Sequence, residues 1–335
     1  MKKTILIVIL LLSQLTKAQN GITRLLAAGQ EDANTFANSY LSPGSDAVAL
    51  GLSNGWFNSA KAKQLGGFEI SVIGSASLVG DDQQQFMLDE ADYEVLQFQN
   101  GPSQQLVGNA LGQNDPDIAV EAVFESSGFT EKVPFNLPQG LADSNINFVP
   151  GGMIQGSVGL ISGFEIKGRF LPEVSTDDVD ISLYGVGLKN ELTRWLPFSK
   201  LFPLHISGFI GYTKFDGSFS VENNSIVESI TEQKIESEME SWNYAALVST
   251  KLPIINFYGS IGYVDASSSA DLIGTYQVSQ GPITGQIQNP IAVDSNTNSL
   301  QTTLGFKLSL AFFKINGQYS FQEYDTVSIG LNFGI

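Results

Sequence analysis

The last forty residues alternate strictly between apolar and polar side chains, which constrains the fold more than any other feature. Between Leu300 and Leu310 one face carries Leu300, Thr302, Leu304, Phe306, Leu308 and Leu310, and the other carries Gln301, Thr303, Gly305, Lys307 and Ser309. The same alternation follows over 313–322 and again over 327–335. A period of two residues predicts β-strands with one apolar and one wet face.

The length of these runs favours a transmembrane barrel over a β-sandwich. Sandwich strands average about five or six residues, whereas these extend over ten or so, the length that crosses a bilayer at a tilt of about 45°. Phe313 and Phe321 would stand roughly 20 Å apart, close to the separation of the two aromatic girdles of an outer-membrane barrel. The polar faces, rich in Gln, Asn, Ser and Lys, suit a wet lumen. A secreted soluble β-protein is the alternative.

The pattern predicts an all-β, antiparallel transmembrane barrel of twelve strands, with fourteen as the alternative because 221–239 and 269–297 could each contain further strands. Tight connections at Ile161, Pro253 and Phe312 all fall on the periplasmic side when strands are counted back from a periplasmic C-terminus, and the long loops fall outside. The candidate strands are 68–79, 82–97, 118–126, 151–160, 163–172, 179–190, 203–220, 240–252, 255–268, 298–311, 313–323 and 325–335.

Residues 1–18 have the layout of a secretory signal. Lys2 and Lys3 precede an apolar run from Ile5 to Leu12, and Thr16-Lys17-Ala18 places small residues at the −3 and −1 positions. The run is too short to span a bilayer, which takes about 20 residues. Cleavage before Gln19 is therefore expected, with an uncleaved anchor as the alternative.

Residues 19–66 read as helical rather than as strand. Apolar side chains recur there at helical spacing, and Pro43-Gly44 is expected to end the helix. We expect three parts: the signal over 1–18, a helical plug or hatch over 19–66, and the barrel over 67–335. A periplasmic helical appendage is the alternative to a plug.

Composition excludes several classes of function. There are no cysteines, one histidine and a formal charge of −17. Disulfides and thiol chemistry are thus excluded, and a nucleic-acid surface is disfavoured. Gly51-Leu52-Ser53-Asn54-Gly55 has the Gly-x-Ser-x-Gly sequence of a nucleophile elbow, with Ser53 as the nucleophile and His205 as the one histidine that could act as its base. The strand that precedes the serine in such an elbow is not expected here. We expect no enzyme activity and no catalytic, cofactor-binding or metal-binding residues, and no ligand-binding residue can be named.

Two further segments carry weaker signals. Acidic residues cluster in regions expected to be external loops, where solvated carboxylates are the simplest interpretation and loose cation binding the alternative: Asp177, Asp178, Asp180, Glu222, Glu228, Glu232, Glu236, Glu238 and Glu240. The stretch from Asn190 to Pro203 is amphipathic, with Trp195 and Phe198 beside Arg194 and Lys200. It predicts an interfacial anchor at the membrane surface, with a partner-docking helix as the alternative.

Three stretches carry a resemblance to a known family: Leu50 to Lys61 with its Gly55-Trp56-Phe57 core, Gly185 to Asn190 followed by Trp195-Leu196-Pro197, and Phe209 to Tyr212. They resemble an uncharacterised family of Gram-negative outer-membrane barrels. That family is similar in layout to the long-chain fatty-acid outer-membrane transporters, with an N-terminal hatch before the barrel. The resemblance implies fourteen strands and supplies no binding residue.

The expected function is passive uptake of a small, hydrophobic molecule through a plugged barrel in the cell outer membrane. A polar lumen face bearing Gln301, Lys307, Asn316 and Gln318 argues instead for a water-filled general porin. A structural or surface-interaction barrel is the third hypothesis. The expected partners are outer-membrane lipid, the barrel-assembly machinery through the C-terminal strand, and a small-molecule cargo, with no cofactor and no nucleic acid.

Overall fold

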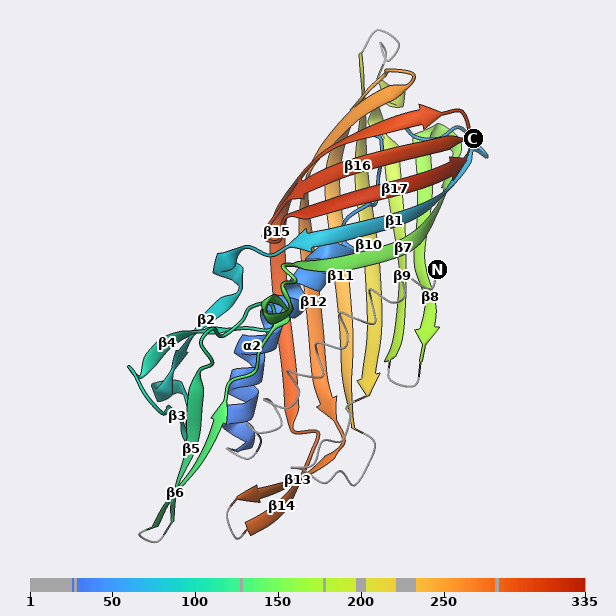
Figure 1. The fold of residues 1–335 in the computed structure, drawn as a ribbon. Coiled ribbons are helices and arrows are strands. Elements are labelled where there is room, and N and C mark those ends of the chain that lie inside the picture. Colours follow the sequence, from blue (N-terminus) through green and yellow to red (C-terminus); the bar gives the residue numbers. More distant parts are fainter. Residues whose placement is uncertain are drawn as a thin grey trace.

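The computed structural model describes residues 26, 29–126, 129–176, 179–196, 203–220, 233–280 and 283–334 (Figure 1). The predicted signal segment 1–18 lies outside this part of the chain. Within these ranges the chain forms one long helix, α2 (Gln30–Leu52), and seventeen strands. Among the described residues, no helix is both long and apolar enough to cross a membrane.

Ten strands close into an antiparallel barrel in the order β1-β17-β16-β15-β12-β11-β10-β9-β8-β7. Their bounds are β1 (Phe68–Leu78), β7 (Phe148–Gly159), β8 (Phe164–Ser175), β9 (Val179–Glu191), β10 (Leu204–Ser220), β11 (Lys234–Thr250), β12 (Ile255–Ile273), β15 (Ile291–Leu310), β16 (Phe313–Phe321) and β17 (Thr326–Gly334). The closing ladder pairs β1 with β17, from Glu69–Gly334 to Ser77–Thr326.

The prediction of twelve or fourteen barrel strands is therefore wrong. The segments 82–97 and 118–126 do form strands, but these pair with other short strands in two small sheets outside the barrel, β2-β4 and β3-β5-β6. The short strands are β2 (Gln85–Asp89), β3 (Leu96–Phe98), β4 (Gln104–Gly108), β5 (Ala119–Ser126) and β6 (Phe129–Asn136). A further hairpin, β13 (Thr275–Gln280) with β14 (Ile283–Gln288), occupies part of 269–297 without joining the wall.

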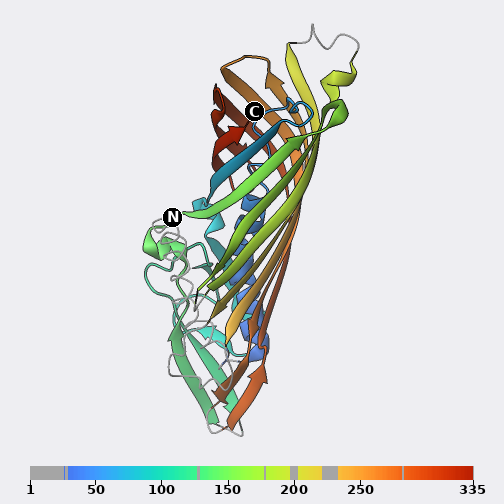
Figure 2. The same cartoon turned by 90° about the vertical axis from the view of Figure 1, so that its right-hand side faces the viewer.

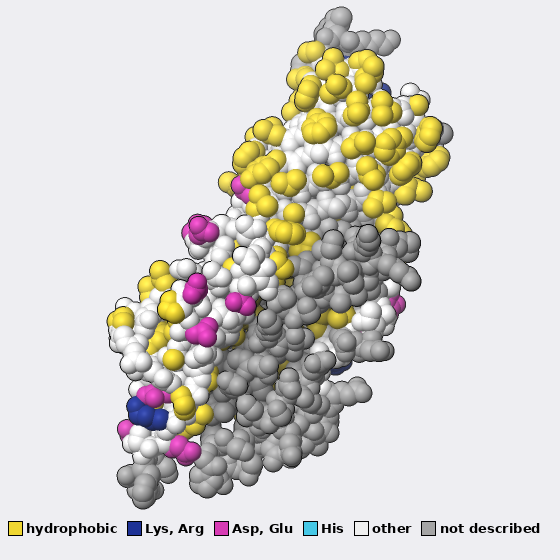
Figure 3. Space-filling view, viewed as in Figure 1, with side chains coloured by type: hydrophobic (Ala, Val, Ile, Leu, Met, Phe, Trp, Pro, Cys, Tyr) yellow, Lys and Arg dark blue, Asp and Glu magenta, His cyan; other side chains and the backbone are white. Residues whose placement is uncertain are grey.

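Side chains alternate across the barrel wall as the sequence predicted. Leu300 and Leu304 point outward, with 74% and 58% of their surface exposed, whereas Gln301 and Thr303 between them are buried. The same division holds for the outward Ile329, Leu331 and Phe333. Figure 3 shows hydrophobic side chains gathered over the part of the barrel formed by β1, β7, β15, β16 and β17. The apolar faces of these strands thus turn away from the lumen.

The two ends of the barrel differ. One end, called here the turn end, carries the C-terminus and the tight connections at 160–163, 251–254 and 311–312. The opposite loop end carries the long connections, including the whole of 79–147 between β1 and β7. This confirms that the tight turns share one end. Strands β10, β11, β12 and β15 have 17 to 20 residues while β16 and β17 have 9, so the wall is tall on one side only (Figures 1 and 2).

Helix α2 continues through Pro43, so the prediction that Pro43-Gly44 ends it is wrong. Pro43 has no N–H, so the carbonyl of Ser39, four residues earlier, loses its usual helix donor, and the proline ring crowds this turn of the helix. In the same turn, the carbonyl of Tyr40 accepts from the backbone N–H of Ala110, at 2.9 Å. Gly44 also packs closely on Ala110 and Leu111. Tertiary contacts from the 79–147 insertion therefore carry the helix past the proline.

The N-terminal half of α2 lies at the loop end in a hydrophobic core. Phe36 and Tyr40 stack there, with ring centroids 5.5 Å apart. Around them pack residues of the small sheets and of the loop ends of the tall strands, including Leu88, Leu96, Val107, Val120, Leu272, Tyr276, Ile291 and Val293. The C-terminal half of α2 runs along the inner faces of β12 and β15 and enters the barrel (Figures 1 and 2).

Candidate functional site

The segment from Ser53 to Lys63 continues from α2 through the interior of the barrel to the turn end. Its contacts are with inward-facing side chains all around the wall, among them Glu69 in β1, Arg169 in β8 and Ser249 in β11. A segment that bonds to opposite sides of a closed barrel lies within it. We call Ser53–Lys63 the lumenal segment.

Trp56 is the main anchor of the lumenal segment. Its indole lies on two glycines, Gly187 and Gly211, which face each other on β9 and β10. A Cβ at either glycine would stand only 2.9 or 2.8 Å from the indole ring. The ring of Phe209 packs beside the indole, with centroids 5.3 Å apart. Both glycines are thus needed because a side chain there would occupy the place of the indole.

Arg169 stacks on the indole and binds the end of the helix. Its guanidinium carbon lies 3.4 Å from the Trp56 ring centroid, a cation–π contact. Nη1 donates to the carbonyl of Leu52 at 2.6 Å, and Nη2 donates to the carbonyl of Asn54 at 3.1 Å and to Gln155 Oε1 at 3.3 Å. The negative end of a helix dipole favours a cation at this position. Arg169 therefore ties helix, lumenal segment and wall together.

Backbone groups of the lumenal segment are bonded directly to the wall. The Ala60 N–H donates to Ser249 Oγ at 3.1 Å, and the Ser59 hydroxyl lies 3.2 Å from that same oxygen. Lys189 Nζ donates to the carbonyls of Ser59 and Lys61, at 3.2 and 3.1 Å, and the Ser207 hydroxyl donates to the carbonyl of Ala60. The segment lacks regular secondary structure, and wall side chains satisfy its buried polar groups instead.

A cluster of buried ion pairs fixes the segment at the turn end. Glu165 contacts three cations, Lys63 at 3.2 Å, Lys167 at 2.9 Å and Lys189 at 3.0 Å. Glu69 pairs with Lys314 at 2.9 Å and with Lys63 at 3.4 Å. Because removing one partner would leave a charge buried and unpaired, such clusters impose a specific arrangement more than they add stability. Lys63 links the segment to two wall carboxylates at once.

The three stretches that carried the family resemblance meet at this site. Trp56 and Phe57 come from Leu50–Lys61, Gly187 and Lys189 come from Gly185–Asn190, and Phe209 and Gly211 come from Phe209–Tyr212. The sequence analysis missed Arg169, Glu165 and Lys167. Their signal was present, since the three charges occupy every second position of a strand whose other face is apolar.

Ser53 and His205, weighed as a hydrolytic pair, each have other partners. The Ser53 hydroxyl donates to the carbonyl of Leu50 at 2.6 Å, at the end of a helix rather than after a strand. His205 Nδ1 lies 2.6 Å from Glu191 Oε1, on the inward face as expected. The structure does not bring the two side chains together through any described hydrogen bond.

The polar wall residues expected to line a water-filled path are largely bonded within the protein. Gln301 contacts Asn54 of the lumenal segment at 3.2 Å and Asn243 at 3.1 Å. Gln318 accepts from the Tyr258 hydroxyl at 3.1 Å, and Asn316 accepts from Asn332 at 2.7 Å. Lys307 donates to Asn58 at 3.4 Å. Part of the inward polar face therefore holds the lumenal segment, and part is bonded within the wall.

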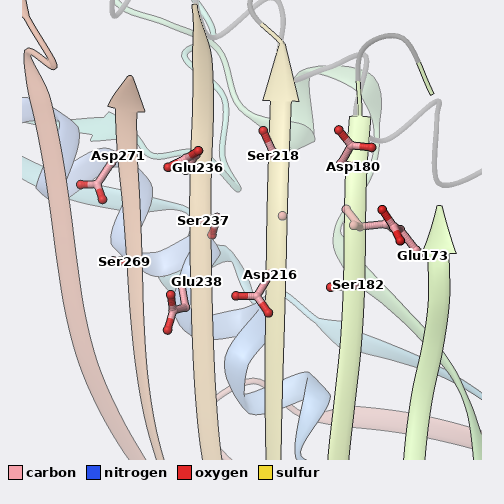
Figure 4. A pocket seen from close by; sticks show the side chains of 12 residues that line it. Glu173, Asp180, Ser182, Asp216, Ser218, Glu236, Ser237, Glu238, Ser269 and Asp271 are labelled. Carbon is pink, nitrogen blue, oxygen red and sulfur yellow. The ribbon is translucent and has the colours of Figure 1, made fainter. Parts of the chain in front are cut away.

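The acidic residues lie on strands rather than in loops wherever the structure describes them, which corrects the prediction. Asp180 belongs to β9, and Glu236, Glu238 and Glu240 belong to β11, which begins at Lys234. Asp177, Asp178, Glu222, Glu228 and Glu232 lie outside the described residues. Asp180, Glu236 and Glu238 line a hollow of about 500 Å³ on the outer face of β8–β12, together with Glu173, Asp216 and Asp271 (Figure 4). No group of metal-ligating side chains occurs in the described part of the chain.

The predicted interfacial anchor at Asn190–Pro203 is described only in part. Residues 192–195 form a 3-10 turn at the turn end, and Leu192, Trp195 and Leu196 are exposed there. Residues 197–202 lie outside the described chain. The interfacial anchor remains a prediction, and the exposed Trp195 is consistent with it.

Comparison with known proteins identifies the family. A model of a family of unknown function, DUF6588, matches residues 1–335. The chain belongs to this family. No curated protein matches it in sequence.

Several solved outer-membrane structures are similar to it in outline. The attachment invasion locus protein Ail of Yersinia pestis has 8% identity and a TM-score of 0.28, covering 81% of this chain and 100% of Ail. The translocator domain of autotransporter NalP from Neisseria meningitidis has 9% identity and a TM-score of 0.29, covering 81% and 88%. The CymD monoaromatic hydrocarbon channel has 8% identity and a TM-score of 0.18, covering 89% and 92%. With TM-scores this low, none of them bears on the function of this chain.

Proposed function

We propose that this protein is an outer-membrane β-barrel that mediates passive uptake of a small hydrophobic molecule, with the lumenal segment acting as a plug that closes the barrel at rest. The single observation that carries the proposal is the placement of Ser53–Lys63 inside the closed barrel, held by side chains from strands all around the wall.

The outer surface supports the membrane location. Ile70, Val186, Ile261, Leu304 and Ile329 come from five strands and expose half or more of their surface. A contiguous apolar band on a closed barrel is stable in lipid and costly in water. On β9 to β12 the band ends at a row of outward aromatic side chains: Tyr184, Tyr212, Trp242, Tyr244 and Tyr263. Beyond that row, toward the loop end, the acidic side chains of the outer hollow begin.

The interior supports a hydrophobic rather than a charged cargo. On the loop side of Arg169 the lumen is lined by Leu52 and Val48 of the helix and by inward side chains of five strands: Ile73, Met153, Leu171, Leu183 and Phe215. An apolar molecule could enter at little cost, because its contacts with these side chains would replace the contacts that the side chains make with one another. An ion would lose its hydration there. A general porin is disfavoured because the polar wall groups are bonded to the plug or to one another.

Uptake by intact cells tests the proposal. Cells that carry the protein should take up an uncharged hydrophobic dye, such as N-phenyl-1-naphthylamine, faster than cells that lack it. A small hydrophilic sugar should enter both kinds of cell at the same rate. Equal dye uptake with and without the protein, across a panel of hydrophobic solutes, would overturn the transport proposal. It would favour the second candidate, a structural or surface-interaction barrel that presents the small sheets of residues 79–147 at the loop end.

The proposed membrane location predicts that a charge on the outer face of the barrel lowers its stability. Replacing Leu304 with lysine should destabilise the folded barrel by roughly 2–4 kcal/mol, because it places a charge on the lipid face. Urea unfolding in lipid vesicles measures the change. Ser267→Lys is the matched control, since Ser267 faces outward beyond the aromatic row and should tolerate the charge. Equal stability of both variants would show that Leu304 does not face lipid.

A further inference from the structure

The buried ion pairs at the turn end include more cations than carboxylates. Five lysines and two glutamates form this set, called here the turn-end cluster: Lys63, Lys167, Lys189, Lys307, Lys314, Glu69 and Glu165. Glu191, at the same end of the barrel, is already paired with Arg194 at 3.0 Å and contacts His205 at 2.6 Å. Among the described residues, five cations against two carboxylates leave a surplus of three positive charges.

Lys307 is the cation of the cluster that pairs with no carboxylate among the described residues. Its Nζ donates to Asn58 Oδ1 at 3.4 Å. An ammonium group has three N–H donors, so further donors remain available. Glu69 lies beyond Asn58, and both of its oxygens are in use. Oε1 accepts from Asn58 at 3.0 Å and pairs with Lys63 at 3.4 Å, and Oε2 pairs with Lys314 at 2.9 Å.

Lys307, Lys314 and Lys63 converge on one region of the lumen from three elements. Lys307 lies opposite Asn316 in the β15–β16 ladder, and Lys314 stands two residues before Asn316 on the same inward face. Long side chains at such diagonal positions come within reach of one another, where like charges repel. Lys63 reaches the same region from the lumenal segment, because it shares Glu69 with Lys314. Three cations thus meet where one carboxylate is present.

The outer edge of the turn-end cluster is open to solvent. The side chains of Lys63 and Lys314 are 15% and 17% exposed, whereas Lys167 and Glu165 are 3% and 0% exposed. A small ion could therefore reach Lys63 and Lys314 from the turn end without displacing the lumenal segment. The exposed fractions are too small for a bulky ligand.

The surface around this edge would not repel an anion. The described turns at 160–163, 192–195, 251–254 and 311–312 contain no Asp or Glu. Glu69, Glu165 and Glu191 are buried beneath them. The acidic side chains of the outer hollow lie toward the opposite end of the barrel. The sign of the charge at the turn end thus favours a negative ligand.

We propose that the turn-end cluster binds a phosphate group, held by Lys307, Lys314 and Lys63. Phosphate carries more than one negative charge near neutral pH, which suits the surplus, and its several oxygens can accept from all three ammonium groups at once. Lys63 belongs to the lumenal segment and the other two lysines to the wall, so bound phosphate ties the segment to the barrel. This site goes beyond the proposed uptake and does not depend on it.

Calorimetric titration with inorganic phosphate tests the site, on the whole protein in a maltoside detergent and against sodium chloride of equal ionic strength. The unaltered protein should bind phosphate saturably. Lys307→Met should weaken the affinity about tenfold or more, because it removes a charge-assisted donor. The matched control is Lys214→Met, which removes a cation paired with Glu238 on the outer face and should leave the affinity unchanged. Heat-modifiable migration verifies that each variant is folded.

Glu69→Gln should change the affinity in the opposite direction. It keeps the shape of the side chain and removes a competing negative charge, so phosphate should bind more tightly. A purely structural role of these ion pairs would not make Lys307→Met and Glu69→Gln differ in sign. No saturable binding by the unaltered protein, or equal affinity in Lys307→Met, would overturn the site. Displacement of phosphate by dihexanoyl phosphatidic acid would assign the site to a lipid headgroup, and its failure to compete would assign it to the free ion.

Discussion

Replacing Arg169 with methionine is expected to convert a closed barrel into a conducting one. Methionine keeps an unbranched stem but removes the guanidinium, and with it three hydrogen bonds and the cation–π contact to Trp56. The carbonyls of Leu52 and Asn54 would then be buried without this donor. Unsatisfied buried groups cost about 1–3 kcal/mol each, so a loss of about 4 kcal/mol would raise the open fraction roughly a thousandfold.

Single-channel recording in a planar lipid bilayer measures this change. The intact protein should show no stable steps, Arg169→Met should show frequent ones, and a protein lacking residues 20–66 should set the upper limit of conductance. Lys214→Met is the matched control, because Lys214 is a cation paired with Glu238 on the outer face and has no contact with the plug. Large stable steps from the intact protein would contradict the plug, and silence from all four proteins would favour a barrel without a transport path.

A disulfide between the plug and the wall is expected to abolish transport until it is reduced. The hydroxyl oxygens of Ser59 and Ser249 lie 3.2 Å apart in the interior, so Ser59→Cys/Ser249→Cys places two thiols within bonding reach. Since the chain has no other cysteine, only this bridge can form. The oxidised protein should take up no hydrophobic dye above cells lacking the protein, and a reductant should restore the rate, because the bond prevents the plug from leaving β11.

The matched control places a disulfide within the wall. Thr303 and Ser320 face each other on β15 and β16, with hydroxyl oxygens 2.9 Å apart. Thr303→Cys/Ser320→Cys joins two strands that are already paired and leaves the plug free. Its uptake should be unchanged on oxidation. Full uptake by the oxidised 59/249 protein, with the disulfide verified by mass spectrometry, would mean that the cargo passes without displacement of the plug at this point.

The face assignments along the barrel could be predicted from the sequence because alternation is a local property. Leu304 and Thr303 lie on opposite sides of β15 whatever the strand pairs with, since successive side chains of any strand point to opposite faces. The tight turns at one end follow from the same alternation of up and down strands. Trp56, Gly187 and Lys189 belong to conspicuous motifs, but nothing local in those motifs indicates that the segment around Trp56 contacts β9.

The strand count, the course of α2 and the nature of the lumen depended on contacts between distant residues. Segment 118–126 has strand character, yet its partner is β6 rather than the wall. Pro43 would end an isolated helix, and α2 continues past it where Ala110 and Leu111 pack against this turn. Gln301 and Lys307 suit a water-filled pore until Asn54 and Asn58 are placed against them. The alternation of side chains is determined within a strand. The choice of strand partners and of the groups that occupy the lumen depends on which remote groups satisfy each buried polar atom, and only the tertiary structure decides that.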